Sequence, residues 1–236
     1  MIDIRRLEKS FGALRVLQGI DLRIRPGQVT ALVGPNAAGK TTLIKCVVGL
    51  VVPDAGEIRI DGVPIRGAWA YREKIGYMAQ VARFPENLTV AEVLRLVKDL
   101  RESPAKNEAL LLGLFGLHAF LGRPLRGLSG GTRQKVNLVL AMMCDPEILI
   151  LDEPTVGLDP LASRRQKDRI LEERARGKTV VLASHAMGEI EELSDRVVFL
   201  LEGRVYFDGT PAELRARTGE ATLERAIARL LERDGR

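Results

Sequence analysis

The stretch Gly34-Pro35-Asn36-Ala37-Ala38-Gly39-Lys40-Thr41-Thr42 decides the fold of this 236-residue chain. The apolar run over residues 29–33 precedes it and predicts a buried strand. The apolar run over residues 43–48 follows it and predicts a helix. A strand, a glycine-rich loop and a helix in this order indicate an α/β domain with a mostly parallel sheet.

The loop itself has the chemistry of a phosphate site. Its successive backbone N–H groups would face one concavity, and the positive end of the following helix would add to the attraction for an anion. Lys40 would reach the β- and γ-phosphates of ATP, and the Thr41 hydroxyl would ligate Mg²⁺. A glycine-rich turn that carries Lys-Thr by chance is the alternative, and the strand and helix around it disfavour that alternative. The residues expected to bind ATP here are Gly34, Pro35, Asn36, Ala37, Ala38, Gly39, Lys40, Thr41 and Thr42.

Composition and charge are those of an ordinary globular protein, with 46% hydrophobic and 28% charged residues. The net charge of +5 could suit nucleotides, anionic lipid or nucleic acid, but a solvated surface explains it as well. Aromatic residues make up only 4% of the chain, and no basic run is interleaved with them. Base stacking on a single strand is therefore not indicated, and no nucleic-acid partner is expected.

The two cysteines and the N-terminal residues indicate the cellular location of the protein. Cys46 and Cys144 lie in apolar, helix-like stretches outside any C-x-x-C pair, so buried free thiols are expected. The N-terminal residues lack the apolar core of a secretory signal, and apolar stretches are too short to span a membrane. We expect a cytoplasmic protein, and any work at a membrane would need another chain to supply the membrane part.

The length suits a single domain over residues 1–236, and hydrophobic periodicity predicts its elements. Alternation over residues 2–7 and 18–24 predicts an N-terminal antiparallel β sub-domain. A helical sub-domain is expected over about 84–128, starting with a capping box of Thr89 and Glu92, and one face of it should carry Leu110, Leu111, Leu114 and Phe115. A C-terminal helical tail over about 219–236 should pack on the body. Further strands are expected at 57–60, 75–79, 148–151, 179–183, 196–201 and 204–207, and further helices at 131–143, 161–176, 187–193 and 210–218.

A second motif lies where the apolar run 148–151 ends in two carboxylates. Asp152 would complete the Mg²⁺ shell, and Glu153 would orient the attacking water or accept its proton. The alternative is an acidic turn after a strand, which the phosphate loop in the same chain disfavours.

A third motif, Leu128-Ser129-Gly130-Gly131-Thr132, opens a predicted helix and forms a second potential anion site. Alone, such a stretch is most often a capped helix start. Its position between the helical sub-domain and the Asp-Glu strand favours the interpretation as an anion site.

The order of these motifs resembles the nucleotide-binding subunit of ATP-binding-cassette (ABC) transporters over about residues 1–218. The resemblance implies a role for each matching residue. In chain order the matches are Phe11 stacking on adenine, 34–42 as the Walker A loop, Gln80 as the Q-loop glutamine at Mg²⁺ or water, Ser129, Gly130 and Gly131 as the signature, Asp152 and Glu153 as the Walker B carboxylates, 157–159 as the D-loop and His185 as the switch histidine.

The resemblance also implies partners. Two nucleotide-binding subunits, identical or different, would pair head to tail, with each ATP between the Walker A loop of one and Ser129 of the other. Transmembrane permease subunits would dock near Gln80 and residues 84–87, on the cytoplasmic face of the cell membrane. ATP hydrolysis would then power transport, in an exporter-type system. A soluble ABC ATPase acting on nucleic acid or the ribosome and a non-catalytic ATP-binding module are the rival functions.

Some residues depart from the family pattern, and others allow a purely structural interpretation. Ala37 replaces a usual glycine, and it would be strained if this position needs a positive φ. Thr132 and Lys135 replace a usual glutamine and arginine, and both are expected to be peripheral to the Ser129 hydroxyl. Phe11 could be a core aromatic, Gln80 an ordinary strand-end residue and His185 a satisfied structural histidine.

Overall fold

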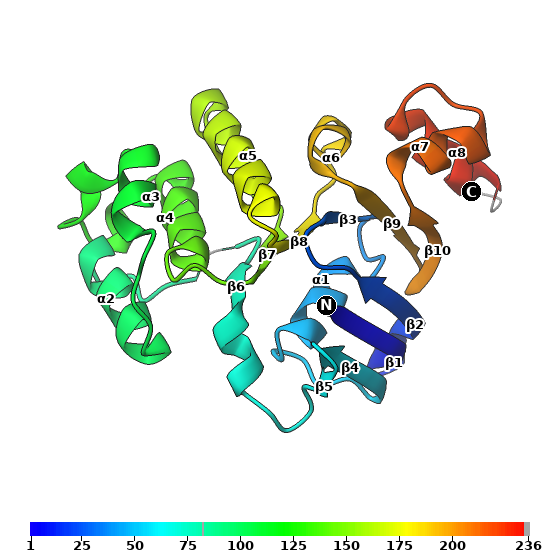
Figure 1. The fold of residues 1–236 in the computed structure, drawn as a ribbon, viewed down its shortest axis with the longest axis horizontal. Helices are drawn as coiled ribbons and strands as arrows, with labels where there is room; N and C mark the ends of the chain where they lie inside the picture. Colours follow the sequence, from blue (N-terminus) through cyan, green and yellow to red (C-terminus); the bar gives the residue numbers. More distant parts are fainter. Residues whose placement is uncertain (82, 234–236) are drawn as a thin grey trace. The chain divides into compact units, whose positions relative to one another are not determined.

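The computed structural model describes residues 1–81 and 83–233, which form two compact units (Figure 1). Unit 1 combines Met1–Trp69 with the chain from Thr179 onward, and unit 2 is Ala70–Lys178.

An antiparallel sheet opens unit 1, as the N-terminal alternation predicts. Strand β1 (Ile2–Phe11) pairs with β2 (Leu14–Ile24) on one side and with β4 (Ala55–Ile60) on the other, and β5 (Val63–Pro64) continues beyond β4. Both β1 and β2 are longer than the alternation indicates, because pairing continues to Phe11 opposite Leu14.

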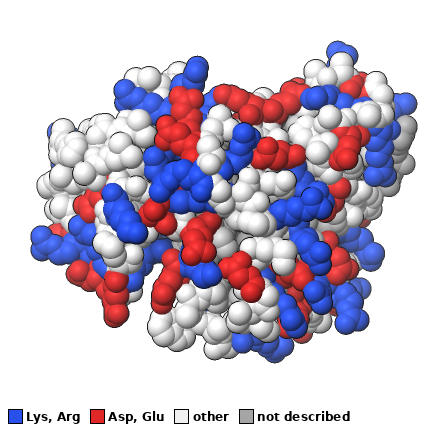
Figure 2. All heavy atoms as spheres, viewed as in Figure 1, with Lys and Arg blue, Asp and Glu red and all other residues white. Residues whose placement is uncertain are grey.

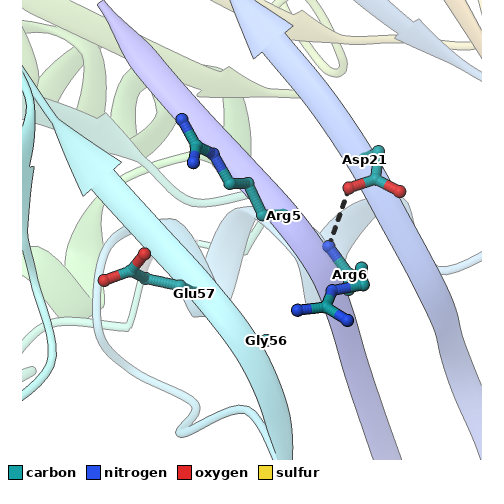
Figure 3. A pocket seen from close by; sticks show the side chains of 5 residues that line it. All are labelled: Arg5, Arg6, Asp21, Gly56 and Glu57. Atoms are coloured by element: carbon teal, nitrogen blue, oxygen red, sulfur yellow. Dashed lines mark hydrogen bonds between the residues drawn. The ribbon is translucent and has the colours of Figure 1, made fainter.

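A β-bulge interrupts this sheet at Arg6, whose φ is +46°. The Arg6 N–H donates to Asp21 Oδ1 over 2.9 Å (Figure 3), so the bulge does not leave this donor unpaired. On the adjacent strand, a Cβ at Gly56 would lie 2.3 Å from the Arg6 carbonyl oxygen, so only glycine fits there. These residues, with Arg5 and Glu57, line a surface hollow of about 570 Å³.

The second sheet of unit 1 positions the glycine-rich loop. Strand β3 (Val29–Val33) runs parallel to β8 (Thr179–Ala183) and to β9 (Arg196–Leu201), and β10 (Arg204–Gly209) pairs antiparallel with β9. Every residue of β3 and β8 is buried, which explains why both strands are continuous apolar runs rather than alternating ones. The helices of unit 1 are α1 (Lys40–Val47), α6 (Met187–Leu193), α7 (Pro211–Thr218) and α8 (Leu223–Arg233).

The C-terminal tail packs as predicted. Leu223, Ala226 and Ile227 of α8 are buried in a core cluster with Phe199 and Leu214. The helix contacts α6 and α7 (Figure 1). The predicted tail extends to residue 236, and its residues 234–236 lie outside the described part of the chain.

Unit 2 contains the predicted helical sub-domain and a pair of parallel strands, β6 (Ile75–Met78) and β7 (Ile148–Asp152). The Thr89 capping box is confirmed: the Thr89 N–H donates to Glu92 Oε2 over 2.7 Å, and the Glu92 N–H donates to Thr89 Oγ1. The helices of unit 2 are α2 (Val90–Arg101), α3 (Glu108–Leu114), α4 (Gly130–Met142) and α5 (Pro160–Ala175), with short 3-10 turns η1 (Ala70–Lys74), η2 (His118–Phe120) and η3 (Leu125–Gly127).

Two burial predictions in unit 2 were wrong. Leu110 was expected on the buried face of its helix, but its side chain is 56% exposed, whereas Leu111 and Leu112 are buried. Successive side chains on a helix are about 100° apart, so three adjacent leucines cannot all face one core. Cys144 is only partly buried, whereas Cys46 is buried as expected, and burial raises the Cys46 thiol pKa to about 11.

Ion pairs form a charged cluster at the C-terminal end of α5. Glu173 is 1% exposed and forms ion pairs with Arg169, Arg176 and Lys178. Lys178 also pairs with Asp145, which accepts a second ion pair from Arg176. For Asp145, burial opposes ionisation, but the hydrogen bond and charge of Lys178, together with Asn107 and Arg176, outweigh it and hold the carboxyl pKa below its ordinary value.

Surface charge is mixed in sign. Figure 2 shows Lys and Arg side chains interspersed with Asp and Glu over the displayed face. Such mixing is typical of a solvated protein surface. Within residues 1–81 and 83–233, no helix is both long and apolar enough to cross a membrane.

Candidate nucleotide site

Two glycines of the loop 34–42 are fixed by close backbone contacts. Gly34 follows β3, and a Cβ there would lie 2.1 Å from the Leu200 carbonyl oxygen. Gly39 is the left-handed N-cap of α1 with a φ of +103°, and its Cβ would lie 2.9 Å from the Val16 carbonyl oxygen. Both positions therefore exclude any side chain, and the turn into α1 depends on glycine.

Ala37 occupies the position where the family pattern has glycine, and its φ is +65°. A non-glycine residue in this left-handed region costs about 1–2 kcal/mol. The strain that we expect for a positive φ at Ala37 is therefore present. The backbone at this residue is left-handed in spite of the alanine methyl group.

Lys40 bends back over the loop that precedes it. Its Nζ donates to the Gly34 carbonyl over 2.6 Å and to the Pro35 carbonyl over 3.0 Å. The ammonium group is held beside the loop by these contacts. Thr41 and Thr42 follow in the first turn of α1 and are half-buried.

Phe11 ends β1 with a ring that is 51% exposed, so the core-aromatic interpretation was wrong. Lys9 Nζ lies 5.3 Å from the ring centroid, close enough for a cation–π contact. Asp54 holds this arrangement from the next loop, because it accepts from Lys9 Nζ over 2.7 Å and from the Ser10 N–H over 2.7 Å. The Lys9 hydrogen bond, then that of Ser10, lowers the Asp54 pKa.

His185 lies in the three-residue connection between β8 and α6, and its side chain is exposed. An exposed imidazole at a strand end disfavours the interpretation of a buried structural histidine. Its neighbours Ser184 and Ala186 are tied by hydrogen bonds, which are developed below.

In unit 2, three predicted residues lie at one sheet edge. Strands β6 and β7 are parallel with Met78 opposite Leu151, so Gln80 and the pair Asp152 and Glu153 follow the same ends of neighbouring strands. Asp152 is 2% and Glu153 7% exposed, whereas Gln80 is exposed. The sheet thus brings together the carboxylates and the glutamine that the resemblance assigns to water and metal.

The charge of Asp152 acts on its surroundings. Tyr77, one residue before Met78 on β6, has a pKa raised to about 12, mainly by burial and then by the Asp152 carboxylate. A buried carboxylate is costly unless other groups compensate it, and oxygen ligands of this kind suit Mg²⁺.

The backbone of Glu153 is left-handed, with a φ of +51°. No sequence pattern predicts a positive φ at this residue. Gln134 of α4 donates from Nε2 to the Glu153 carbonyl over 3.4 Å, and the Val156 N–H donates to the same oxygen over 3.3 Å. One turn later on α4, Asn137 donates to the Ala79 carbonyl over 2.9 Å, beside Gln80. Helix α4 therefore anchors the ends of both strands.

The signature motif begins the same helix. Ser129 is the N-cap of α4, and its Oγ accepts from the Thr132 N–H over 3.2 Å. A Cβ at Gly131 would lie 2.7 Å from the Gly157 carbonyl oxygen, so glycine is required there.

The two departures in this motif are not both peripheral. The Thr132 hydroxyl lies 2.9 Å from Ser129 Oγ, so the prediction that it stands apart from that hydroxyl was wrong. A threonine can reach back to the N-cap where a helix begins, because both residues lie in the same turn. Lys135 pairs with Asp159 over 2.7 Å and thereby ties the helix to the D-loop.

Comparison with known proteins agrees with this geometry. The sequence model of a family described as "ABC transporter" matches residues 17–156. The chain belongs to this family. It is 37% identical over 220 residues to the Nod factor export ATP-binding protein I of Paraburkholderia xenovorans (strain LB400). The aligned region covers 91% of this chain and 72% of the relative. It is 37% identical over 223 residues to the daunorubicin resistance ATP-binding protein DrrA3 of Streptomyces coeruleorubidus, covering 92% and 71%.

Among solved structures, one described as an ATP binding subunit of an ABC transporter has a TM-score of 0.92 and 33% sequence identity, covering 98% of this chain and 99% of that one. The predicted ABC ATPase fold, with an antiparallel N-terminal sheet and a mostly parallel second sheet, is confirmed. The chain is an ATP-binding and ATP-hydrolysing subunit of this family.

The side chains expected at the metal are oxygen donors, which Mg²⁺ prefers. Across the described part of the chain, no three or more His, Cys, Asp or Glu side chains gather to hold a metal ion. Mg²⁺ is usually bound through one or two carboxylates together with substrate phosphates and waters. The Thr41 hydroxyl and the Asp152 carboxylate are oxygen donors of this kind.

Proposed function

We propose that this subunit hydrolyses ATP to power export through separate transmembrane subunits. The observation that carries the proposal is the joint presence of a loop locked by Gly34 and Gly39, with Lys40 held over it, and two buried carboxylates at the end of β7. The names of two relatives, for export and for drug resistance, support export rather than import.

Each site residue has a proposed role toward Mg²⁺·ATP. Phe11 stacks on adenine, and Lys40 with the N–H groups of the loop binds the β- and γ-phosphates. Thr41 and Asp152, with Gln80, would hold Mg²⁺, which would neutralise phosphate charge.

Hydrolysis needs an oriented water and little covalent chemistry from the protein. Glu153 orients that water and accepts its proton, and burial of its side chain restricts the directions in which the carboxyl group can point. His185 donates an N–H to the γ-phosphate, which a neutral imidazole can do.

The second anion site acts on a neighbouring nucleotide-binding subunit. Ser129 and Gly130 are exposed at the start of α4, and no catalytic carboxylate belongs to this motif itself. We infer that Ser129, Gly130 and Gly131 close over the ATP held by the second subunit, in a head-to-tail pair. ATP binding closes this pair, and hydrolysis reopens it.

A groove in unit 2 is suited to the permease. It has a volume of about 320 Å³ and combines apolar with charged side chains. Val81 in this groove is 64% exposed, so it offers apolar surface that a permease segment could cover. A permease segment seated here would place the subunit on the cytoplasmic face of the membrane. The lining residues are Val81, Arg83, Phe84, Glu86, Leu125 and Arg133.

The proposal is tested by Glu153→Gln. The variant keeps the size of the side chain but removes the proton acceptor, so ATP turnover should fall below detection while ATP binding persists. Size-exclusion chromatography with saturating Mg²⁺·ATP should then show an accumulated dimer. Glu147→Gln, which alters an exposed carboxylate paired with Lys74, is the matched control and should behave as wild type. A Glu153→Gln protein that stays monomeric with ATP bound, or that still hydrolyses ATP, contradicts the proposal.

A further inference from the structure

The turn that carries His185 is closed by a small ring of hydrogen bonds. Strand β8 ends at Ala183 and α6 begins at Met187, so three residues connect them. The Ser184 hydroxyl donates to Glu189 Oε2 over 2.8 Å, and Ser184 Oγ accepts from the Ala186 N–H over 3.1 Å. Ser184 thus links both flanks of the turn to the helix that follows.

The two side chains in this ring are buried, although the histidine beside them is exposed. Ser184 is 1% and Glu189 7% exposed. Glu189 also bonds to the turn through its backbone, because its N–H donates to the Ala186 carbonyl over 3.0 Å. Helix α6 carries two other glutamates, Glu191 and Glu192, and both are exposed. Of the three glutamates, Glu189 is the buried one, and it bonds to the connection through Ser184.

A buried carboxylate is a poor choice for stability alone. Taking its charge out of water is costly, and well-packed apolar residues often stabilise a core at least as well. A hydrogen bond between a hydroxyl and a carboxylate is, however, short, strong and directional. Such a bond is suited to fixing one backbone conformation where orientation matters.

The residue that this conformation orients is His185. Its two chain neighbours, Ser184 and Ala186, are the two residues bonded in the ring. The directions in which the backbone enters and leaves His185 are therefore set, and with them the direction of its Cα–Cβ bond. The imidazole is presented to solvent from a fixed support.

We propose that Ser184 and Glu189 are positioning residues that hold the His185 imidazole in the orientation in which it contacts the γ-phosphate. This inference rests on the proposed role of His185. Neither positioning residue touches the nucleotide in this account: Glu189 acts on Ser184, and Ser184 acts on the turn.

Three variants test the ring in steady-state ATP turnover by the subunit with its membrane partners. Ser184→Ala removes both hydrogen bonds and should lower kcat about tenfold, the factor that corresponds to about 1.4 kcal/mol of lost transition-state contact. KM for ATP should change little, because the Gly34–Thr42 loop still binds the phosphates. Ser184→Thr keeps the hydroxyl and should restore kcat. Glu189→Gln keeps a neutral acceptor and should give an intermediate kcat, and Glu192→Gln is the matched control on the exposed side of α6.

The same variants in a His185→Ala background separate positioning from other effects. If Ser184 acts through the histidine, Ser184→Ala should cause no further loss of kcat once the imidazole is gone. An equal loss in both backgrounds overturns the inference, and so does wild-type kcat for Ser184→Ala. Unchanged turnover in His185→Ala itself would instead refute the proposed role of the histidine.

Stability must be measured beside the kinetics. Thermal unfolding followed by circular dichroism reports whether Ser184→Ala weakens the fold. If that variant does not fold, the comparison of Glu189→Gln with Glu192→Gln decides the matter, because Gln retains the shape of the buried side chain. Equal kcat values for these two variants count against the inference.

Discussion

Replacing Ala37 by glycine should stabilise the protein, which is the opposite of the usual effect of glycine. Ala37 has a φ of +65° and an exposed side chain, so its methyl group gives little packing and causes strain. Removing that strain favours the folded state by about 1–2 kcal/mol. The greater freedom of glycine in the unfolded chain opposes this by roughly 0.5–1 kcal/mol. A net gain of about 0.5–1 kcal/mol is expected from these two terms.

The neighbouring alanine provides the control. Ala38 is 3% exposed and does not have a positive φ. Ala38→Gly therefore relieves no strain, adds the same chain entropy and loses a buried methyl group worth about 0.8 kcal/mol. We expect it to destabilise the protein by about 1–2 kcal/mol.

Urea unfolding of the two variants and the wild type measures both effects. Ala37→Gly should raise the midpoint, Ala38→Gly should lower it, and the slope of free energy against urea should stay the same. Calorimetric titration should show that Ala37→Gly still binds Mg²⁺·ATP, since backbone N–H groups supply the contacts. If Ala37→Gly destabilises the protein as much as Ala38→Gly does, the left-handed strain assigned to Ala37 is absent.

Three further predictions concern residues around the site. Asp54→Asn should raise KM for ATP a few-fold with little change in kcat, because the lysine beside Phe11 loses its anchor; an unchanged KM would count against this clamp. Gln134→Leu should lower kcat more than it raises KM, because it removes a hydrogen bond worth about 1 kcal/mol from the strained Glu153 backbone; wild-type kinetics would contradict that role. Asp145→Asn should lower thermal stability at pH 7, and the difference from wild type should shrink as the pH falls below 3.8, because the lowered pKa of Asp145 gives stability only while the carboxyl is ionised. A constant difference across this range would refute the last prediction.

Features set by local sequence could be predicted. The runs 29–33 in β3 and 148–151 in β7 identify buried strands because they are apolar apart from Thr30 and too short for a helix. The Thr89 capping box could be predicted from two residues because its hydrogen bonds close within one turn. The glycine-rich loop could likewise be located, since Gly34 and Gly39 occupy positions that no side chain can enter.

Features set by distant contacts could not be predicted. The strain at Glu153 is stabilised by Gln134, which lies 19 positions away in the sequence, and no local pattern indicates that pairing. The anchoring of Phe11 depends on Asp54, which is contributed by a separate turn. Leu110 was misplaced because periodicity alone does not say which of three adjacent leucines the core accepts.

The signature motif contains one feature that the sequence predicts and one that it does not. Its identity followed from Ser129 and Gly131, and the need for glycine at position 131 is explained by the Gly157 carbonyl. The contact between Thr132 and Ser129 was missed, because a substitution judged by residue type alone does not reveal that the new hydroxyl reaches the old one.

The most direct test of the account is complementation between two inactive variants. Lys40→Ala removes the phosphate contact of the loop, and Ser129→Glu places a negative charge where the signature should meet a γ-phosphate. Each variant alone should lack ATP turnover. If the site is shared between two subunits, a mixed pair retains one site with an intact Lys40 from one chain and an intact Ser129 from the other. We therefore predict that mixing the two variants restores turnover, whereas a mixture that forms dimers yet stays inactive would contradict the head-to-tail site.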